Sequence, residues 1–356
     1  MLSQLSRYDI QKSYESNYEN SPETQYIDLP AVSGKWSFCG LPVPSPLGIP
    51  AGPLLNGRWV LYYASLGFDV LTYKTVRSQS VPCYGAPNLV PVECGQLDGS
   101  EFALPMRKTM DGSWAVSFGM PSRAPDQWRA DVEETRRQLP KDKLLSVSVV
   151  ATQQEGWSML DLANDYAQCA KWAVESGADC VETNFSCPNV STCDGQLYQD
   201  ADNAALVASV VKEQIGHVPY ILKIGRIDEP EKAAILLKAV HPFVNAIALT
   251  NSLATTVVDS TGQPLFDGKH RGICGDGIRT KSVAQVRMMA DIIRQHDYDI
   301  ELIGVGGVNS ASHVRQYLEA GAQAVHLATA VMVEPRVGLQ IREELGTELQ
   351  SRSVRE

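Results

Sequence analysis

The sequence predicts an α/β fold, a (β/α)8 barrel of the TIM type, from three observations. From Leu47 onward, short runs rich in β-branched and aliphatic residues alternate with amphipathic helical stretches, the pattern of βα units in a parallel sheet. Eight such units can be counted in the chain. Polar residues follow several strands at their C-terminal ends, where such a barrel carries its active site. A doubly wound open sheet is the alternative, although no strand leads into the GxGxxG turn of dinucleotide folds.

The predicted strands are, in chain order, Leu47–Ala51, Val70–Lys74, Leu144–Val150, Asp179–Asn184, Tyr220–Ile224, Val244–Thr250, Glu301–Val305 and Ala324–Ala328. The helices predicted to follow them include Pro125–Leu139, Ser158–Ser176, Asn203–Ile215, Glu229–Val240, Ser282–Gln295, Ala311–Ala320 and Glu334–Leu345. Two connections are much longer than ordinary βα loops, and connections of that length are usually functional inserts. We therefore expect two inserts over the C-terminal face of the barrel, at residues 75–123 and 252–279.

The same pattern predicts one large domain with short additions at its ends. Residues 1–45 are expected to form an N-terminal arm and a cap at the barrel bottom, where Trp36–Val43 would be a strand or hairpin. Residues 46–346 would form the barrel with its inserts, and residues 347–356 a C-terminal tail. At 356 residues and 44% hydrophobic content, the chain can bury a core of that size.

Composition narrows the class of partner. The chain has 41 acidic and 31 basic residues, and its net charge of −10 argues against general binding to nucleic acid or anionic membranes. Its eight cysteines show no CxxC pair and no Cys/His cluster at metal-binding spacing, so we expect reduced thiols and no metal. The N-terminal sequence lacks a signal-peptide pattern, and no apolar stretch of about 20 residues occurs. These features predict a cytoplasmic protein that acts on a small molecule.

The fourth predicted strand runs directly into a polar turn that contains a cysteine. Asn184 ends the strand, Cys187 and Asn189 follow, and Pro188 prevents the strand from continuing. A free cysteine is most often a small buried apolar residue, but its polar neighbours here favour a chemical role for Cys187. A nucleophilic hydrolase would need a histidine beside Cys187. No histidine falls at the end of a predicted strand, although His270 in the second insert keeps the hydrolase alternative open.

Two lysines end predicted strands. Lys74 closes the second strand and Lys223 the fifth, each after an apolar run. A side chain that snorkels to solvent is the alternative for each. Because both would lie at the same rim, we expect them to point into one site.

The last two strands end in turns suited to an anion. Gly306 and Gly307 follow the seventh strand, and Ala328-Thr329-Ala330 follows the eighth. Glycines allow an anion to approach the backbone N–H groups, and barrels frequently bind phosphate at this place. Ordinary tight turns are the alternative reading.

Taken together, these motifs resemble the dihydroorotate dehydrogenase family, FMN-dependent barrels that include the pyrimidine-reducing domain of dihydropyrimidine dehydrogenase. The resemblance spans roughly Pro46 to Met332 and is most specific in the turn from Asn184 to Asn189. Supporting motifs are Tyr73-Lys74-Thr75, Ser117-Phe118-Gly119-Met120-Pro121, Thr250-Asn251-Ser252, Gly272-Ile273-Cys274-Gly275 and Gly304-Val305-Gly306-Gly307-Val308.

The resemblance implies an FMN lying across the barrel mouth. The residues that it implies for cofactor binding are Ala51, Gly52, Lys74, Lys223, Thr250, Gly272, Gly306, Gly307, Ala328 and Thr329. It implies catalytic roles for Lys74 and for Cys187, which as general base would remove a carbon-bound proton while hydride passes to flavin N5. The substrate ring would be hydrogen-bonded by Asn184, Asn189, Asn251 and Ser252. A cysteine base resembles the soluble branch of the family, and relatives suggest a homodimer.

Three positions depart from the family pattern. Val116 and Ser122 stand where the family usually has asparagine, and Arg271 where glycine is usual. We therefore expect FMN-dependent oxidation of a CH–CH bond next to a carbonyl, with dihydroorotate to orotate as the leading reaction. The same flavin chemistry on another ring is the first alternative, and a non-catalytic barrel that binds flavin or a phosphorylated ligand is the second. The sequence identifies no electron acceptor.

Overall fold

A closed barrel of parallel strands forms the centre of the protein. The computed structural model describes residues 5–186 and 193–353. The barrel strands are, in order around the barrel, β3 (Leu47–Ile49), β4 (Val70–Val76), β8 (Leu144–Val149), β9 (Cys180–Asn184), β10 (Tyr220–Lys223), β11 (Ala246–Leu249), β14 (Glu301–Val305) and β15 (Ala324–His326). β15 pairs with β3 and closes the circle. The predicted (β/α)8 fold is confirmed, and each strand lies within its predicted range or within two residues of it.

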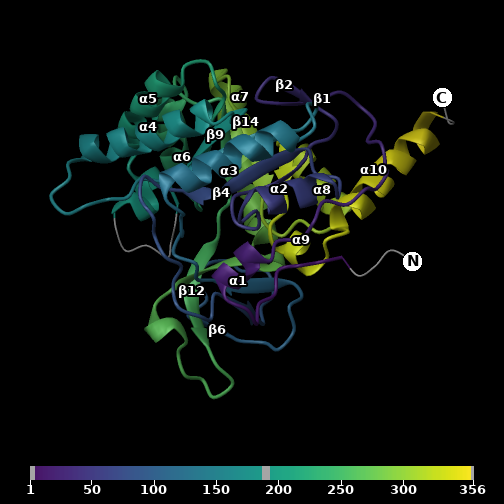
Figure 1. Cartoon of the computed structure of the whole chain (residues 1–356), viewed down its shortest axis with the longest axis horizontal. Helices are drawn as coiled ribbons and strands as arrows, with labels where there is room; N and C mark the ends of the chain where they lie inside the picture. The colour runs from purple at the N-terminus through teal and green to yellow at the C-terminus, as the bar shows by residue number, and fades with distance from the viewer. Residues whose placement is uncertain (1–4, 187–192, 354–356) are drawn as a thin grey trace.

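Helices surround this barrel (Figure 1). They are α2 (Gly57–Ala64), α3 (Pro125–Gln138), α4 (Met159–Glu175), α5 (Ala201–Ile215), α6 (Pro230–Val240), α7 (Arg279–His296), α8 (Ala311–Glu319), α9 (Thr329–Val333) and α10 (Val337–Ser353). Residues at the N-termini of several helices explain where those helices begin. Ser158 caps α4 in a capping box with Asp161, and a proline occupies the first turn of α3 and of α6. α7 begins before the predicted Ser282 because the 3-10 turn Asp276–Ile278 runs directly into it.

A hairpin lies at the N-terminal ends of the barrel strands. It consists of β1 (Trp36–Phe38) and β2 (Leu41–Val43), which pair antiparallel. Phe38 is fully buried and packs with residues at the lower ends of the barrel strands, such as Val70 and Leu144. The hairpin thus closes this end, so ligands reach the barrel interior from the opposite end.

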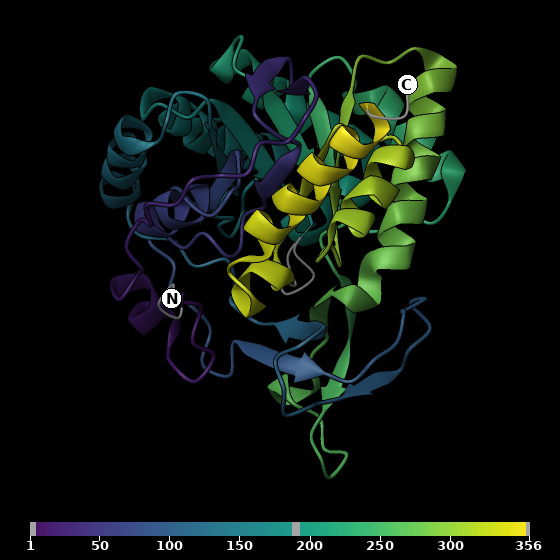
Figure 2. The same cartoon turned by 90° about the vertical axis from the view of Figure 1, so that its right-hand side faces the viewer.

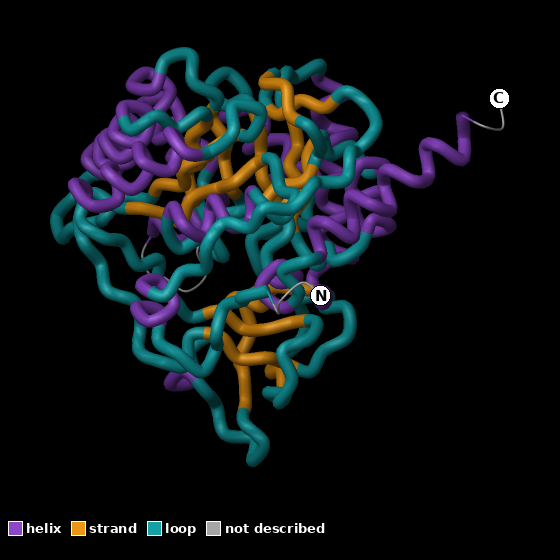
Figure 3. The backbone as a smooth tube through the Cα atoms, turned by 45° about the vertical axis from the view of Figure 1, so that its right-hand side comes forward, coloured by secondary structure: helices purple, strands orange, loops and turns teal. Residues whose placement is uncertain are grey.

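The two inserts build one antiparallel-rich sheet at that opposite end. β5 (Leu89–Val92), β6 (Ala103–Pro105) and β7 (Ser113–Val116) come from the first insert. β12 (Leu253–Val258) and β13 (Arg271–Gly275) come from the second. Their order is β5-β7-β13-β12-β6, so strands of the two inserts alternate in part. Figure 3 shows this sheet as a separate group of strands facing the barrel mouth.

The N-terminal arm reaches both ends of the barrel (Figure 2). It contains α1 (Tyr14–Glu19), and the Tyr8 and Tyr14 rings pack edge-on against Phe118 of the first insert at 6.0 and 5.8 Å between centroids. Further along, the Pro30 carbonyl accepts a 2.7 Å hydrogen bond from Nε of Arg342 in α10. Of the helices that the structure describes, none is long and apolar enough to cross a membrane.

Candidate active site

Two cavities meet between the barrel mouth and the insert sheet. The first, of about 130 Å³, extends from the β3 and β4 ends to the insert sheet, and the second, of about 400 Å³, lies over the ends of β14 and β15. They share the residues Asn251, Cys274, Val305, Ala328 and Thr329. The two cavities therefore form one elongated site, with a narrow slot at one end and a wider chamber at the other.

The slot has an apolar wall supplied by the first insert. Trp114, Val116, Phe118 and Met120 line it, opposite Ala51 and Gly52 of the β3 end. Trp114 and Val116 reach the slot together because side chains two positions apart share one face of β7. Sequence reasoning did not identify Trp114 as a site residue, although the alternation within Ser113–Val116 is a strand signal.

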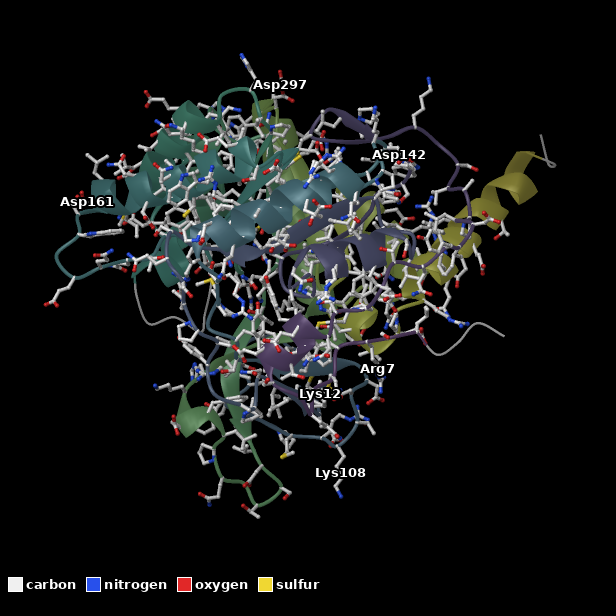
Figure 4. All side chains as sticks on the ribbon, in the orientation of Figure 1. Arg7, Lys12, Lys108, Asp142, Asp161 and Asp297 are labelled. Atoms are coloured by element: carbon white, nitrogen blue, oxygen red, sulfur yellow. The ribbon has the colours of Figure 1, made fainter. Side chains whose placement is uncertain are left out.

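Both predicted lysines lie in this slot. Lys74 Nζ is 4.7 Å from the centroid of the Phe118 ring, and Lys223 Nζ donates a 3.5 Å hydrogen bond to the Ala51 carbonyl. Lys74 is 8% and Lys223 5% exposed, whereas Lys12 and Lys108 project from the outer surface (Figure 4). The two strand-end lysines thus place two cations around one small volume.

An amide and hydroxyl cluster faces the lysines. Asn251 Nδ2 donates to Asn184 Oδ1 at 3.5 Å and to Ser186 Oγ at 3.0 Å, and it also contacts the Ser186 carbonyl. Asn184 Nδ2 lies 3.5 Å from Met120 Sδ, and Ser252 lines the same slot. The register explains this convergence, because Asn184 pairs with Lys223 at the ends of β9 and β10.

Cys187 and Asn189 lie outside the described residues, so their roles stay predictions.

The wider chamber has a floor of bare backbone. Gly306 and Gly307 have φ of 127° and 67°, which side-chain-bearing residues rarely adopt. A Cβ at Gly306 would lie 2.6 Å from Ser282 Oγ, and one at Gly307 would lie 2.6 Å from Arg279 Cβ. Ala328 and Thr329 line the other side of the chamber. Such a cradle presents backbone rather than side chains, as a phosphate site requires.

The chamber is lined by three carboxylates, those of Asp111, Asp276 and Glu334, and the first two lie beside arginines. Asp276 lines the chamber, but its carboxylate forms a 3.1 Å ion pair with Arg279. An anion at the cradle is therefore not opposed by an uncompensated Asp276 charge.

Of three further residues singled out from the sequence, one lines the slot and two make contacts elsewhere. The Thr250 hydroxyl donates a 2.9 Å hydrogen bond to Gln285, whose amide bonds the Gly225 carbonyl, and Thr250 is absent from the described lining of both cavities. Gly272, in contrast, lines the slot. Arg271 points into the insert, where Nε donates to Ser117 Oγ at 2.8 Å.

Of the other two departures from the family pattern, one is at the slot and one is not. Val116 lines the slot directly. The Ser122 hydroxyl accepts a 3.0 Å hydrogen bond from the Arg77 backbone and donates to the Arg123 carbonyl, so it serves the insert backbone. Val116 is therefore the departure that changes the site surface.

Burial shifts the pKa of three groups, one at the barrel mouth and two inside the barrel. Burial raises the pKa of Cys274 to about 11, with a hydrogen bond from Thr329 as a smaller opposing effect. Burial also raises the pKa of Glu182, and Lys223 opposes that shift. The pKa of His326 is lowered to about 3 by burial and further by Lys223. At neutral pH, Cys274 is a thiol and His326 is uncharged.

Comparison with known proteins identifies the family. The chain matches the family described as dihydroorotate dehydrogenase over residues 34–349. A dihydroorotate dehydrogenase of Dictyostelium discoideum is 31% identical, over 94% of this chain and 95% of the relative. The catalytic subunit of a dihydroorotate dehydrogenase B (NAD(+)) of Methanocaldococcus jannaschii is 22% identical, over 83% of this chain and 87% of the relative.

A solved structure agrees in fold. The crystal structure of the Eimeria tenella enzyme named DHODH, in complex with ferulenol, has a TM-score of 0.76 and 15% sequence identity, covering 95% of this chain and 90% of that one. The resemblance predicted from the sequence motifs is confirmed. The chain therefore belongs to the dihydroorotate dehydrogenase family, which consists of flavin-dependent oxidoreductases acting on a CH–CH bond.

Proposed function

We propose that this protein oxidises dihydroorotate to orotate, using an FMN bound across the barrel mouth. The observation that carries the proposal is the continuity of one site: two buried lysines and an asparagine pair surround a slot that opens into a glycine-floored chamber. The names of the relatives supply the substrate class.

The described residues suit FMN in shape and chemistry. The slot between the β3 end and the wall of Trp114 and Val116 is narrow and largely apolar, as a flat aromatic ring requires. The chamber offers backbone N–H groups for a phosphate. We expect contacts to FMN from Ala51, Gly52, Lys74, Lys223, Gly272, Gly306, Gly307, Ala328 and Thr329. When bound, FMN supplies the hydride acceptor.

Lys223 would stabilise negative charge at the inner edge of the slot. Its ammonium is held beside the Ala51 carbonyl and is nearly removed from solvent. A cation placed in such a water-poor site interacts strongly with charge that develops during a reaction. Thr250, predicted from the resemblance to contact the cofactor, would instead act through Gln285 on the β10 end.

The substrate ring would be held by amide and hydroxyl groups. Dihydroorotate carries imide-like donors and acceptors, and asparagine offers both kinds of partner. We assign this role to Asn184, Asn251 and Ser252, and to Asn189 as predicted from the sequence. Lys74 would attract the substrate carboxylate, because it is a buried cation at the same slot.

Cys187 would act as the general base. Oxidation of a CH–CH bond removes a proton from one carbon and a hydride from its neighbour, and a double bond forms between them. The nearby thiol of Cys274 is a poor base at neutral pH, since burial raises its pKa to about 11. We therefore assign the proton transfer to Cys187, which follows β9 in the sequence.

Val116 favours a second candidate, the same chemistry on a less polar ring. It places an aliphatic side chain on the slot surface where the family usually has asparagine. A substrate with fewer polar atoms than dihydroorotate would lose less binding free energy beside this aliphatic side chain, because fewer of its polar atoms would be left without a hydrogen bond. The predicted homodimer and cytoplasmic location stay predictions.

Anaerobic reduction of the flavin distinguishes the candidates. Purified protein is mixed with dihydroorotate, dihydrouracil or dihydrothymine, and loss of the oxidised flavin absorbance is followed. Fast bleaching by dihydroorotate, slowed strongly in Cys187→Ser but not in Cys94→Ser of the insert, supports the proposal. Bleaching by another ring alone would favour the second candidate, and protein that takes up no FMN would refute both.

A further inference from the structure

Glu182 is a buried carboxylate inside the barrel that the reaction described above does not use. It lies on β9, is 1% exposed, and its Oε1 has no hydrogen-bond partner among the described residues. Ser148 supplies a hydrogen bond to this carboxylate, and the charge of Lys223 also acts on it. A buried carboxylate with one unpaired oxygen is costly unless an opposite charge lies close to it.

Lys223 is placed to supply that charge. On the adjacent strand β10, Ile221 pairs with Glu182 and Lys223 pairs with Asn184. Glu182 and Lys223 therefore lie on the same inward face of neighbouring strands, one pair of residues apart along the barrel axis. Lys223 is itself 5% exposed, so each charge lies where water screens it little.

The other charged groups nearby do not take this place. Among the described residues, Asp69 is the other acidic residue buried to this degree, and it is already paired with Lys143 Nζ at 2.5 Å and Arg342 Nη1 at 2.7 Å. His326 faces the same region but is neutral, because burial lowers its pKa to about 3. Burial raises the pKa of Glu182, and Lys223 is the neighbouring charge that opposes this shift. Glu182 is therefore the carboxylate that is placed to balance Lys223.

We propose that Glu182 partly neutralises Lys223 and thereby sets the reduction potential of the flavin at the barrel mouth. The inference rests on the proposed function, because it needs a flavin beside Lys223. A fixed negative charge behind the lysine disfavours the gain of negative charge by the cofactor, so Glu182 keeps the potential low. It acts through Lys223 and is a positioning residue, not a catalytic one.

The midpoint potential of the purified holoprotein tests this directly. Glu182→Gln keeps the size of the side chain and removes its charge, so the equilibrium constant for two-electron reduction should rise at least about tenfold, which corresponds to about 30 mV. Glu182→Asp restores a carboxylate and should return the potential toward the wild-type value. Glu301→Gln makes the same change at the other end of the barrel, where the carboxylate accepts hydrogen bonds from the Cys39 and Gly40 backbone, and should leave the potential unchanged.

A potential in Glu182→Gln that matches the Glu301→Gln control, or that falls, overturns the inference. Activity alone would not do so, because a structural defect also lowers activity. Flavin content is measured in each variant, so that a lost cofactor is not read as a shifted potential.

A double-mutant cycle tests the pair without using the flavin potential. Thermal unfolding of the full chain is measured for Glu182→Gln, Lys223→Met and the double variant. If the two charges compensate each other, the double variant loses less thermal stability than the sum of the single losses. Additive losses overturn the inference. A colourless protein that takes up no FMN refutes the proposed function instead, while the cycle still reports on the pair.

Discussion

The side-chain amide of Asn251 donates a hydrogen bond to the side-chain oxygen of Asn184 at 3.5 Å, across 67 positions of sequence. Asn184 ends β9, and Asn251 follows the end of β11, so the two residues stand on either side of the β10 end that carries Lys223. This arrangement joins the two amides into one polar surface beside a buried cation.

Removing the Asn251 amide should weaken substrate recognition. In Asn251→Ala, we expect kcat/KM for dihydroorotate to fall by about 10- to 100-fold, because one ring contact is lost and the Asn184 and Ser186 oxygens lose their donor. Steady-state kinetics with a fixed acceptor measures the change. Asn20→Ala, at the exposed end of α1, is the control and should retain wild-type kinetics.

The pH dependence should identify the base. A base must be deprotonated, so activity rises with pH until its pKa is passed. In Cys187→Ser, the rising limb should move to higher pH, because a hydroxyl loses its proton less readily than a thiol. In Cys274→Ala, the limb should keep its position, since the Cys274 pKa of about 11 lies above the working range. A limb that moves in Cys274→Ala would instead identify that residue as the base.

The glycine cradle should tolerate no side chain. In Gly307→Ala, we expect FMN binding at least about tenfold weaker, because a Cβ would meet Arg279 and occupy a backbone conformation with φ of 67°. Flavin content and titration of the stripped protein measure this. Gly262 has φ of 82°, but a Cβ there would meet nothing within 4 Å, so Gly262→Ala carries the backbone strain without the collision. Equal losses of FMN affinity in both variants would mean that strain, not contact, is responsible.

The buried His326 should make the fold sensitive to acid. The pKa of His326 is about 3 in the folded chain, against an ordinary value of 6.5. Between pH 3 and pH 6.5, the unfolded chain therefore binds a proton at this histidine that the folded chain does not bind. Its contribution to stability is present above pH 6.5 and is lost as the pH falls toward 3. In this window, His326→Gln should reduce the pH dependence of the unfolding free energy by about 1.4 kcal/mol per pH unit.

Denaturant unfolding at several pH values measures that difference. His217→Gln changes an exposed histidine after α5 and should leave the slope as in the wild type. A slope unchanged in His326→Gln would show that His326 is protonated in the folded protein.

The barrel could be predicted from sequence because its signals are local. Each strand is a short apolar run that ends in a turn or polar residue, and the ends of parallel strands meet at one rim. The same reasoning placed Asn184, Lys74 and Lys223 together, since each follows directly from a strand end. Gly306 and Gly307 could be predicted for the same reason.

The insert sheet could not be predicted, because its pairing is not local. β7 pairs with β13, which lies in the other insert, and each strand is only four or five residues long. Without that pairing, Val116 and Trp114 could not be placed on the slot wall. The contacts of Thr250 and Arg271 likewise depend on partners far along the chain, Gln285 and Ser117.

The closing seam of the barrel has a consequence for how the protein is made. β3 needs β15 as its neighbour, and the Asp69 carboxylate needs the Arg342 guanidinium of α10. A chain emerging from the ribosome therefore holds β3, its first barrel strand, without one of its neighbours until Ala324–His326 of β15 have been translated. During that interval, the exposed edge of β3 offers unpaired backbone groups to other nascent chains, which makes assistance by chaperones more valuable for this protein than for one built from local pairings.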